Sequence, residues 1–221
     1  QLGTDQLGRD VLSRLMWGTR VSLYVGIGAT LLGQFFGVFV GAVSGYYGGR
    51  VDTLLMRLTD FFLTLPSLPL LLVLSVILNA NVEVVIVILA GLGWMGAARL
   101  VRGVVLSLRE QEFIEASHAM GMGDGKIILR HMIPNSMAPI IVNVTLGIGT
   151  TIIVEAALSF LGFGVKPPIP SWGNMLNRVQ DYILMNPFLA VYPGLAIFLT
   201  VLAFNFMGDG LRDALDPRLK M

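Results

Sequence analysis

The chain has 221 residues, of which 55% are hydrophobic and only 13% are charged, and its mean hydropathy is +0.77. Soluble domains average about 25% charged residues, so this composition places the chain among membrane proteins. The formal net charge of +1 provides no long-range field that would attract nucleic acid. The absence of cysteine excludes disulfides and thiolate metal sites.

Five apolar stretches are long enough to cross a bilayer as helices. A hydrocarbon core of about 30 Å needs about 20 helical residues. In the second stretch, Leu65-Pro66 and Pro69 predict a kink or a break, because proline removes a backbone donor. We therefore predict an all-α, polytopic membrane fold. The expected spans are residues 21–45, 60–79, 83–106, 137–163 and 188–207.

The positive charges indicate the orientation of these spans, since cytoplasmic loops carry an excess of Lys and Arg. Residues 109–134 lie on the richer side and are expected to be cytoplasmic, whereas residues 164–187 are expected to be external. Five spans then place Gln1 outside without a signal-peptide pattern, so we expect a sixth, upstream span in the full chain. The richer side holds Arg50, Arg57, Arg99, Arg102, Arg109, Lys126, Arg130, Arg212, Arg218 and Lys220, and the poorer side holds Arg9, Arg14, Arg20, Lys166 and Arg178.

Two external segments have the pattern of helices that lie along a membrane surface. In residues 9–20, Asp10 and Arg14 are four apart and are predicted to pair. Ser171 is a predicted N-cap of a second such helix, whose apolar face extends to Ile183. The predicted organisation is an external interfacial segment over residues 1–20 and a transmembrane domain over residues 21–221.

Small residues and a local charge pair indicate how the first two spans pack. Glycine recurs every fourth residue along the first span, which is typical of a seam where two helices approach closely. Arg57 and Asp60 are three apart near the second span and are predicted to form a local ion pair. The glycine seam consists of Gly33, Gly37, Gly41 and Gly45.

Residues 109–134 are polar and separate two apolar spans, and their pattern predicts two short helices. Gly121 is expected to end the first helix in the left-handed conformation. Asp124 is expected to cap the second helix, which Pro134 would stop near residue 132. Two interpretations remain open from these residues alone: a docking surface, or an ordinary solvated loop, which usually lacks such an ordered end of one helix and beginning of the next.

The fourth span contains an acidic side chain at bilayer depth. Glu155 would cost on the order of 3 kcal/mol if it faced lipid, so it should face protein or a water-filled path. Two interpretations remain open: a carboxylate that meets a cationic amine of a substrate, or a structural hydrogen-bond partner for another subunit. Thr151 lies on the same face and Asn143 is polar in the same span, so these three residues are the candidates for a translocation path.

The stretch Glu115-Ala116-Ser117, followed by Gly121 and Pro134, resembles the E-A-A…G…L-P coupling segment of permease subunits from ATP-binding-cassette importers. Residues 3–10, 155–162 and 208–219 resemble the branch of these permeases that imports dipeptides, oligopeptides or nickel. The resemblance covers essentially the whole chain. Ser117 in place of the second Ala and Gly125 inside the second coupling helix are mild departures from the family pattern.

This resemblance implies a type I importer permease fold with six spans in the full chain, located in the inner or plasma membrane. It implies transport of short peptides, with nickel or another small solute as the alternative. The implied partners are a homologous second permease subunit, two ATP-binding-cassette ATPase subunits and an extracytoplasmic solute-binding protein. The implied residues for coupling to the ATPase are Glu115, Ala116, Ser117, Gly121, Asp124 and Pro134.

The sequence predicts no catalytic or metal site of its own. It contains no G-x-x-x-x-G-K-[ST] loop, so ATP and Mg²⁺ are expected in the partner ATPase subunits and no cofactor is expected in this chain. His118 and His131 match no metal-binding spacing. A channel or an ion-coupled secondary transporter is a more distant alternative, which would need an intramembrane relay and often an inverted repeat. Glu155 is the single deep carboxylate, and no inverted repeat is visible.

Overall fold

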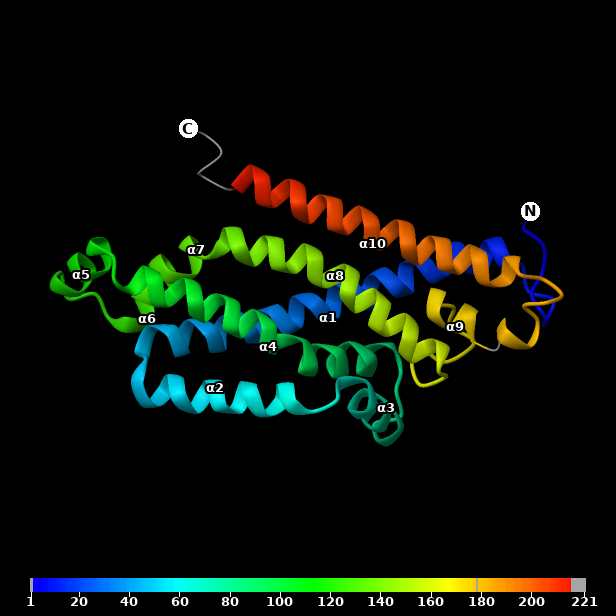
Figure 1. The fold of residues 1–221 in the computed structure, drawn as a ribbon, viewed down its shortest axis with the longest axis horizontal. Helices are drawn as coiled ribbons and strands as arrows, with labels where there is room; N and C mark the ends of the chain where they lie inside the picture. Colours follow the sequence, from blue (N-terminus) through cyan, green and yellow to red (C-terminus); the bar gives the residue numbers. More distant parts are fainter. Residues whose placement is uncertain (1, 178, 216–221) are drawn as a thin grey trace.

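The structure is a computed structural model that describes residues 2–177 and 179–215. Within these ranges, the regular secondary structure consists of helices joined by turns and loops, together with one isolated β-bridge. Among the described residues, four helices are long and apolar enough to cross a membrane, and they run lengthwise through the molecule in Figure 1. The predicted all-α fold and four of the predicted spans are therefore confirmed, although the last helix continues past residue 207. These helices are α1 (Val11–Tyr47), α4 (Val82–Arg109), α8 (Met137–Phe160) and α10 (Phe188–Leu215).

Helix α1 includes the segment that the sequence assigned to a separate helix before residue 21. Asp10 caps this helix, because its carboxylate accepts a hydrogen bond from the Ser13 backbone N–H at 2.7 Å. Arg14 instead contacts Asp5, with 2.6 Å between its Nη1 and Oδ2. The predicted pair of Asp10 and Arg14 is wrong because the cap occupies the Asp10 carboxylate.

The second predicted span is two helices joined at a sharp bend. Helix α2 (Gly49–Thr64) and α3 (Ser67–Ile77) meet at 87°, and together they can count as a fifth, broken span. Leu65 is extended, with φ −76° and ψ 134°, as expected for a residue before proline. The break at Leu65-Pro66 is confirmed, but the helix begins at Gly49 rather than near residue 60.

The glycine seam packs α1 directly against α4, as predicted. A Cβ on Gly37 would lie 2.5 Å from the Trp94 carbonyl oxygen, and one on Gly41 would collide with the Ala98 carbonyl oxygen. The two backbones therefore approach more closely than any larger residue would allow.

Charged side chains join α2 to α4 rather than pairing within α2. Arg102 holds Asp52 through two hydrogen bonds of 2.5 and 2.6 Å. Asp60 contacts Arg99 at 2.5 Å, so the predicted local pair of Arg57 and Asp60 is wrong. The reason is tertiary, since α4 lies beside α2 and presents its own arginines to these carboxylates.

Short elements gather at the two ends of the bundle (Figure 1). One end carries α5 (Glu112–Ala119), α6 (Asp124–Ile127), the π-helical turn η1 (Ile128–Met132) and α7 (Ile133–Asn135). The opposite end carries the N-terminal segment, α9 (Trp172–Leu176) and the 3₁₀ turn η2 (Val179–Asp181). The predicted cytoplasmic and external loops thus lie at opposite ends, while their placement relative to a membrane stays a prediction.

At the α9 end, the predicted N-cap is confirmed because Ser171 Oγ accepts a hydrogen bond from the Asn174 N–H at 3.1 Å. The predicted helix to Ile183 is wrong, since α9 ends at Leu176. Asn174 turns inward to donate to the Ile169 carbonyl at 2.6 Å and to accept from Arg14 at 3.2 Å, which ties α9 to α1 and its own loop. Three basic residues used for the predicted orientation, Arg178, Arg218 and Lys220, lie outside the described residues.

Candidate coupling and translocation sites

The coupling segment, residues 109–134, forms a short helix, a glycine turn and a second helical stretch. Helix α5 ends at Ala119, and Gly121 has φ +78°, which confirms the predicted left-handed residue at the turn. Only glycine adopts this conformation at little cost, so the turn fixes the direction in which the chain leaves α5.

The outer surface of α5 is exposed and carries two of the predicted residues. Glu115 and Ala116 are exposed, and Met120 keeps 75% of its surface accessible. Leu129 on η1 adds another exposed apolar side chain, at 70%. An exposed surface that combines these apolar side chains with the acidic Glu112 and Glu115 has the composition of a contact surface for another protein.

The inner surface of the segment is buried against the ends of the long helices. Ile114, Ile127 and Met132 are each at most 1% exposed, and they pack in one cluster with Val105 of α4 and Ile140 of α8. Apolar burial of this kind stabilises the segment as a folded part of the molecule.

Two further predicted coupling residues, Ser117 and Asp124, make contacts within the chain. Ser117 is 3% exposed and its hydroxyl donates to the Phe113 carbonyl at 2.7 Å, so it faces inward. Gly123 is the N-cap of α6, and Asp124 is its first helical residue, so the predicted cap at Asp124 is wrong. The Asp124 carboxylate instead accepts a hydrogen bond from the Tyr46 hydroxyl at 2.9 Å.

Pro134 does not stop the second helix as predicted. The chain stays helical through η1 and α7 as far as Asn135, and α8 begins two residues later. The π turn shifts the hydrogen-bond register, and Pro134 lies in the first turn of α7, where its missing N–H costs little. The second half of the coupling segment therefore leads almost directly into α8.

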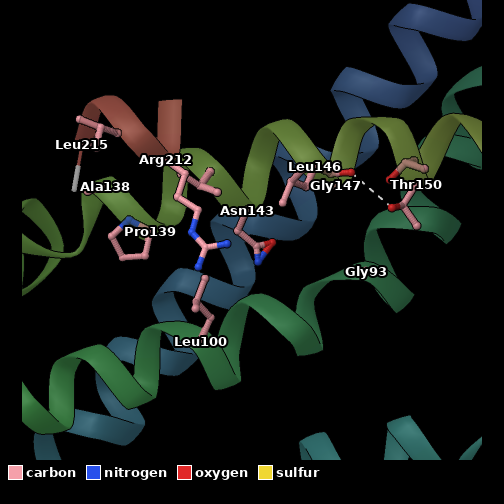
Figure 2. Close-up of a pocket in the computed structure, with 12 residues that line it drawn as sticks. Gly93, Leu100, Ala138, Pro139, Asn143, Leu146, Gly147, Thr150, Arg212 and Leu215 are labelled. Carbon is pink, nitrogen blue, oxygen red and sulfur yellow. Dashed lines mark hydrogen bonds between the residues drawn. The ribbon is translucent and has the colours of Figure 1, made fainter. Parts of the chain in front are cut away.

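A pocket of about 780 Å³ opens between α4, α8 and α10. Asn143 and Thr151, predicted as path residues, both line it, and the structure thus brings these two together. Figure 2 shows Arg212 extending from α10 toward Asn143 and Leu100. The remaining lining residues are Gly93, Ala138, Pro139, Val142, Leu146, Gly147, Thr150 and Leu215.

Polar pairs between α1 and α8 lie behind the two predicted path residues. Gln34 donates from Nε2 to Asn143 at 2.8 Å, and the Thr30 and Thr151 hydroxyls are 2.9 Å apart. Gln34 Oε1 is buried and has no partner in the part of the chain that the structure describes. The sequence reasoning missed Gln34, although an amide inside an apolar span is a visible signal.

Glu155 lies away from this pocket. It is fully buried, and its carboxylate accepts hydrogen bonds from Ser159 at 2.7 Å and from Ser22 at 3.4 Å. The Trp172 backbone N–H in turn donates to Ser22 Oγ at 3.1 Å. Glu155 is therefore joined through Ser22 to the first residue of α9 and presents no surface to a cargo in this structure.

Metal binding finds no support within residues 2–177 and 179–215, where no three Asp, Glu or His side chains come together as ligands. His118 Nε2 instead lies 3.2 Å from the Tyr46 hydroxyl oxygen. The His131 ring is tilted by 55° from the Phe113 ring, with 6.2 Å between their centroids.

Comparison with known proteins places this sequence in one protein family. The family described as "Binding-protein-dependent transport system inner membrane component" matches residues 37–221. The dipeptide transport system permease protein DppC of Alkalihalophilus pseudofirmus is 46% identical over 99% of this chain and 72% of its own length. The glutathione transport system permease protein GsiD of Pectobacterium atrosepticum is 45% identical over 99% of this chain and 73% of its own length.

Solved structures show the same fold at much lower sequence identity. A chain of the inward-facing MetNI methionine ABC transporter superposes with a TM-score of 0.72 at 20% identity, covering 92% of this chain and 96% of its own. A chain of an amino acid ABC transporter crystallised with histidines gives a TM-score of 0.59 at 16% identity, covering 92% of this chain and 95% of its own. The predicted permease fold is confirmed.

Proposed function

The chain belongs to the family of binding-protein-dependent transport system inner membrane components, and we propose that it forms the translocation path for short peptides in an ATP-driven importer. As a member of this family it is a multi-pass inner-membrane permease rather than a catalytic subunit, and permeases of this family carry no cofactor. ATP hydrolysis belongs to partner ATPase subunits of the ATP-binding-cassette type.

The proposed cargo is a short peptide because of the relatives and the chemistry of the pocket. The relatives named above transport a dipeptide and glutathione, both of which carry carboxylates. Within the described part of the chain, the pocket is lined by Arg212 and by no Asp or Glu. A cationic guanidinium near apolar walls attracts a peptide carboxylate and opposes entry of a nickel cation.

Asn143 and Thr151 complete the proposed path. Both residues belong to the α8 wall of the pocket, where their polar groups can hydrogen-bond the peptide backbone while apolar neighbours contact side chains. The pocket volume of about 780 Å³ is in the range typical of small-molecule sites. Glu155 enters this proposal as an anchor of the start of α9 rather than as a residue in contact with cargo.

The proposed assembly pairs this chain with a homologous permease subunit, two ATPase subunits and an extracytoplasmic binding protein. The ATPase would dock on cytoplasmic residues 109–134, and the binding protein would face external residues 164–187. The exposed surface of α5, supported from beneath by buried Ile114, is the observation that carries the docking proposal. Glu115, Ala116 and Gly121 form or orient that surface. Ser117 supports it from the buried side, and Asp124 ties the second helix to Tyr46.

Two glycine substitutions in the turn test the docking proposal. Gly121→Val places a β-branched residue at φ +78° and should misdirect the chain after α5, which should weaken ATPase association by about tenfold or more. Gly123→Val is the matched control, because Gly123 has φ −70° and no atom lies within 4 Å of a Cβ built there.

The measurement is co-purification of the ATPase with each variant, together with uptake of radiolabelled dialanine and glutathione by membrane vesicles. A charge reversal, Glu115→Lys, should also weaken association because it changes the exposed surface and no apolar contact beneath it. Wild-type association in both Gly121→Val and Glu115→Lys would show that residues 109–134 do not form the docking site.

A further inference from the structure

We propose that the Tyr46 hydroxyl is a positioning group for energy coupling, which holds both coupling helices to the end of α1. The proposal rests on the proposed docking of an ATPase on residues 109–134, and it adds the residue that transmits movement from that surface to the spans. Tyr46 lies in the last turn of α1 and is only 6% exposed.

One hydroxyl contacts both helices of the coupling segment. Tyr46 Oη lies 2.9 Å from Asp124 Oδ1 at the start of α6 and 3.2 Å from His118 Nε2 near the end of α5. The Tyr46 and His118 rings also stack, with 6.0 Å between centroids and 20° between planes. Because α5 and α6 are separated by the Gly121 turn, this hydroxyl fixes their relation to each other as well as to α1.

The hydrogen-bond directions follow from the donors available. A phenol has one proton, and an ionised carboxylate only accepts, so Tyr46 must donate to Asp124. The contact with His118 then requires the imidazole to donate from Nε2 to the phenolic oxygen. His118, Tyr46 and Asp124 thus form a chain of two hydrogen bonds in one direction, and Asp124 is its charged end.

The main chain of Tyr46 is held as well as its side chain. Arg109, the last residue of α4, donates from Nη1 to the Tyr46 carbonyl oxygen at 3.1 Å. The end of α1 is therefore bonded to the end of α4 on one side and to α5 and α6 on the other. A displacement of the coupling segment reaches both long helices through this residue.

Apolar packing alone does not define the orientation of the coupling helices. The cluster of Ile114, Ile127 and Met132 holds the segment in place, but apolar contact is non-directional and permits rotation or sliding. The hydrogen bonds of Tyr46 add direction. Replacing the hydroxyl alone, by Tyr46→Phe, keeps the aromatic ring in the cluster and separates these two contributions.

The test uses the complete importer, with both permease subunits, both ATPase subunits and the binding protein reconstituted in lipid. Since this chain has no native cysteine, Thr150→Cys provides a reporter in the pocket lining when the partners are also free of cysteine. The rate of maleimide labelling is measured without nucleotide and after trapping with ATP and vanadate. The difference between these rates reports how far a nucleotide-driven change reaches the proposed path, and it requires no known cargo.

Tyr46→Phe should retain ATPase association, basal ATP turnover and thermal stability close to the parent. The nucleotide-dependent change in labelling rate should fall by about 2- to 30-fold, the range expected for a residue that couples two sites. Tyr47→Phe is the matched control, because it removes the hydroxyl of the neighbouring tyrosine, a residue that is 50% exposed. Asp124→Asn keeps an oxygen acceptor and should retain much of the response, whereas Asp124→Leu should reproduce the loss. Combining Asp124→Leu with Tyr46→Phe should add little, since both remove the same bond.

A full labelling response in Tyr46→Phe would overturn the proposal. Loss of ATPase association in this variant would also overturn it, because the hydroxyl would then belong to docking rather than to transmission. Failure of the docking proposal itself would be distinguished by the Gly121→Val and Glu115→Lys variants, which test association directly.

Discussion

Substituting one glycine of the α1–α4 seam tests whether close backbone packing holds these two helices together. In Gly41→Ala, the new Cβ would meet the Ala98 carbonyl oxygen and would lie 3.0 Å from the Arg102 backbone nitrogen. Both are backbone atoms of α4 and cannot rotate away as a side chain could. The helices must therefore separate locally, and the neighbouring contacts along the seam weaken with them.

The expected loss of stability follows from overpacking. One additional methyl group in a tightly packed contact costs about 1–3 kcal/mol. For a chain of this size, each kcal/mol shifts the midpoint of thermal unfolding by about 2–4 °C. A cost near 2 kcal/mol thus corresponds to a fall of about 4–8 °C.

The assay is the fraction of folded, monodisperse protein that remains after heating in detergent, followed by size-exclusion chromatography of a fluorescent fusion. Gly103→Ala is the control on the same helix pair, because no atom lies within 4 Å of a Cβ built at Gly103. Alanine is favoured over glycine in a helix by about 1 kcal/mol, so this variant should match or slightly exceed the parent. Equal midpoints for Gly41→Ala and Gly103→Ala would refute the reasoning about the seam.

Two further predictions concern polar groups near the α9 end. Glu155→Leu should unfold at a lower temperature than Glu155→Gln, because leucine leaves the Ser22 and Ser159 hydroxyls without their acceptor, at about 1–3 kcal/mol for each buried group; equal midpoints would contradict an anchoring role. For Asp5, burial acts to raise the carboxyl pKa, but hydrogen bonds from the Arg9 and Leu7 backbone and from the Arg14 and Arg9 side chains hold the pKa below its usual value. Its contribution to stability is therefore present above the unfolded-state pKa of about 3.9 and is lost as pH falls through the lower folded-state pKa. The midpoint difference between the parent and Asp5→Asn should accordingly be present at pH 6 and shrink below pH 4, and a difference independent of pH would contradict this account.

The features that sequence reasoning predicted correctly are those with a local or periodic cause. The presence of the long apolar helices follows from the length that a bilayer needs, the seam of Gly37 and Gly41 follows from spacing along one helix face, and Gly121 follows from the backbone conformation that a turn needs. The break at Leu65-Pro66 has the same character, since proline constrains its own neighbours.

The features that sequence reasoning missed depend on residues that are distant in the chain. Local spacing predicted that Arg14 would pair with Asp10, but in the structure Arg14 contacts Asp5 and Asn174. In the same way, Asp124 was assigned to a helix cap, whereas the fold brings it to Tyr46. A charged side chain has several possible partners within reach, and only the tertiary arrangement decides among them.

The contacts of α1 determine which parts of the pocket wall can move independently. Its glycine seam interlocks with the α4 backbone, and hydrogen bonds at Thr30 and Gln34 join it to the α8 wall at Thr151 and Asn143. Interlocked backbones cannot slide without separating, so we expect α1 and α4 to respond to a displacement of the coupling segment as one body, with α8 attached by polar pairs. By contrast, only 6% of the 18-residue apolar stretch of α10 is buried within the described part of the chain. The α10 wall, which carries Arg212, is therefore the side of the pocket that this chain constrains least, and its position depends most on what surrounds the subunit.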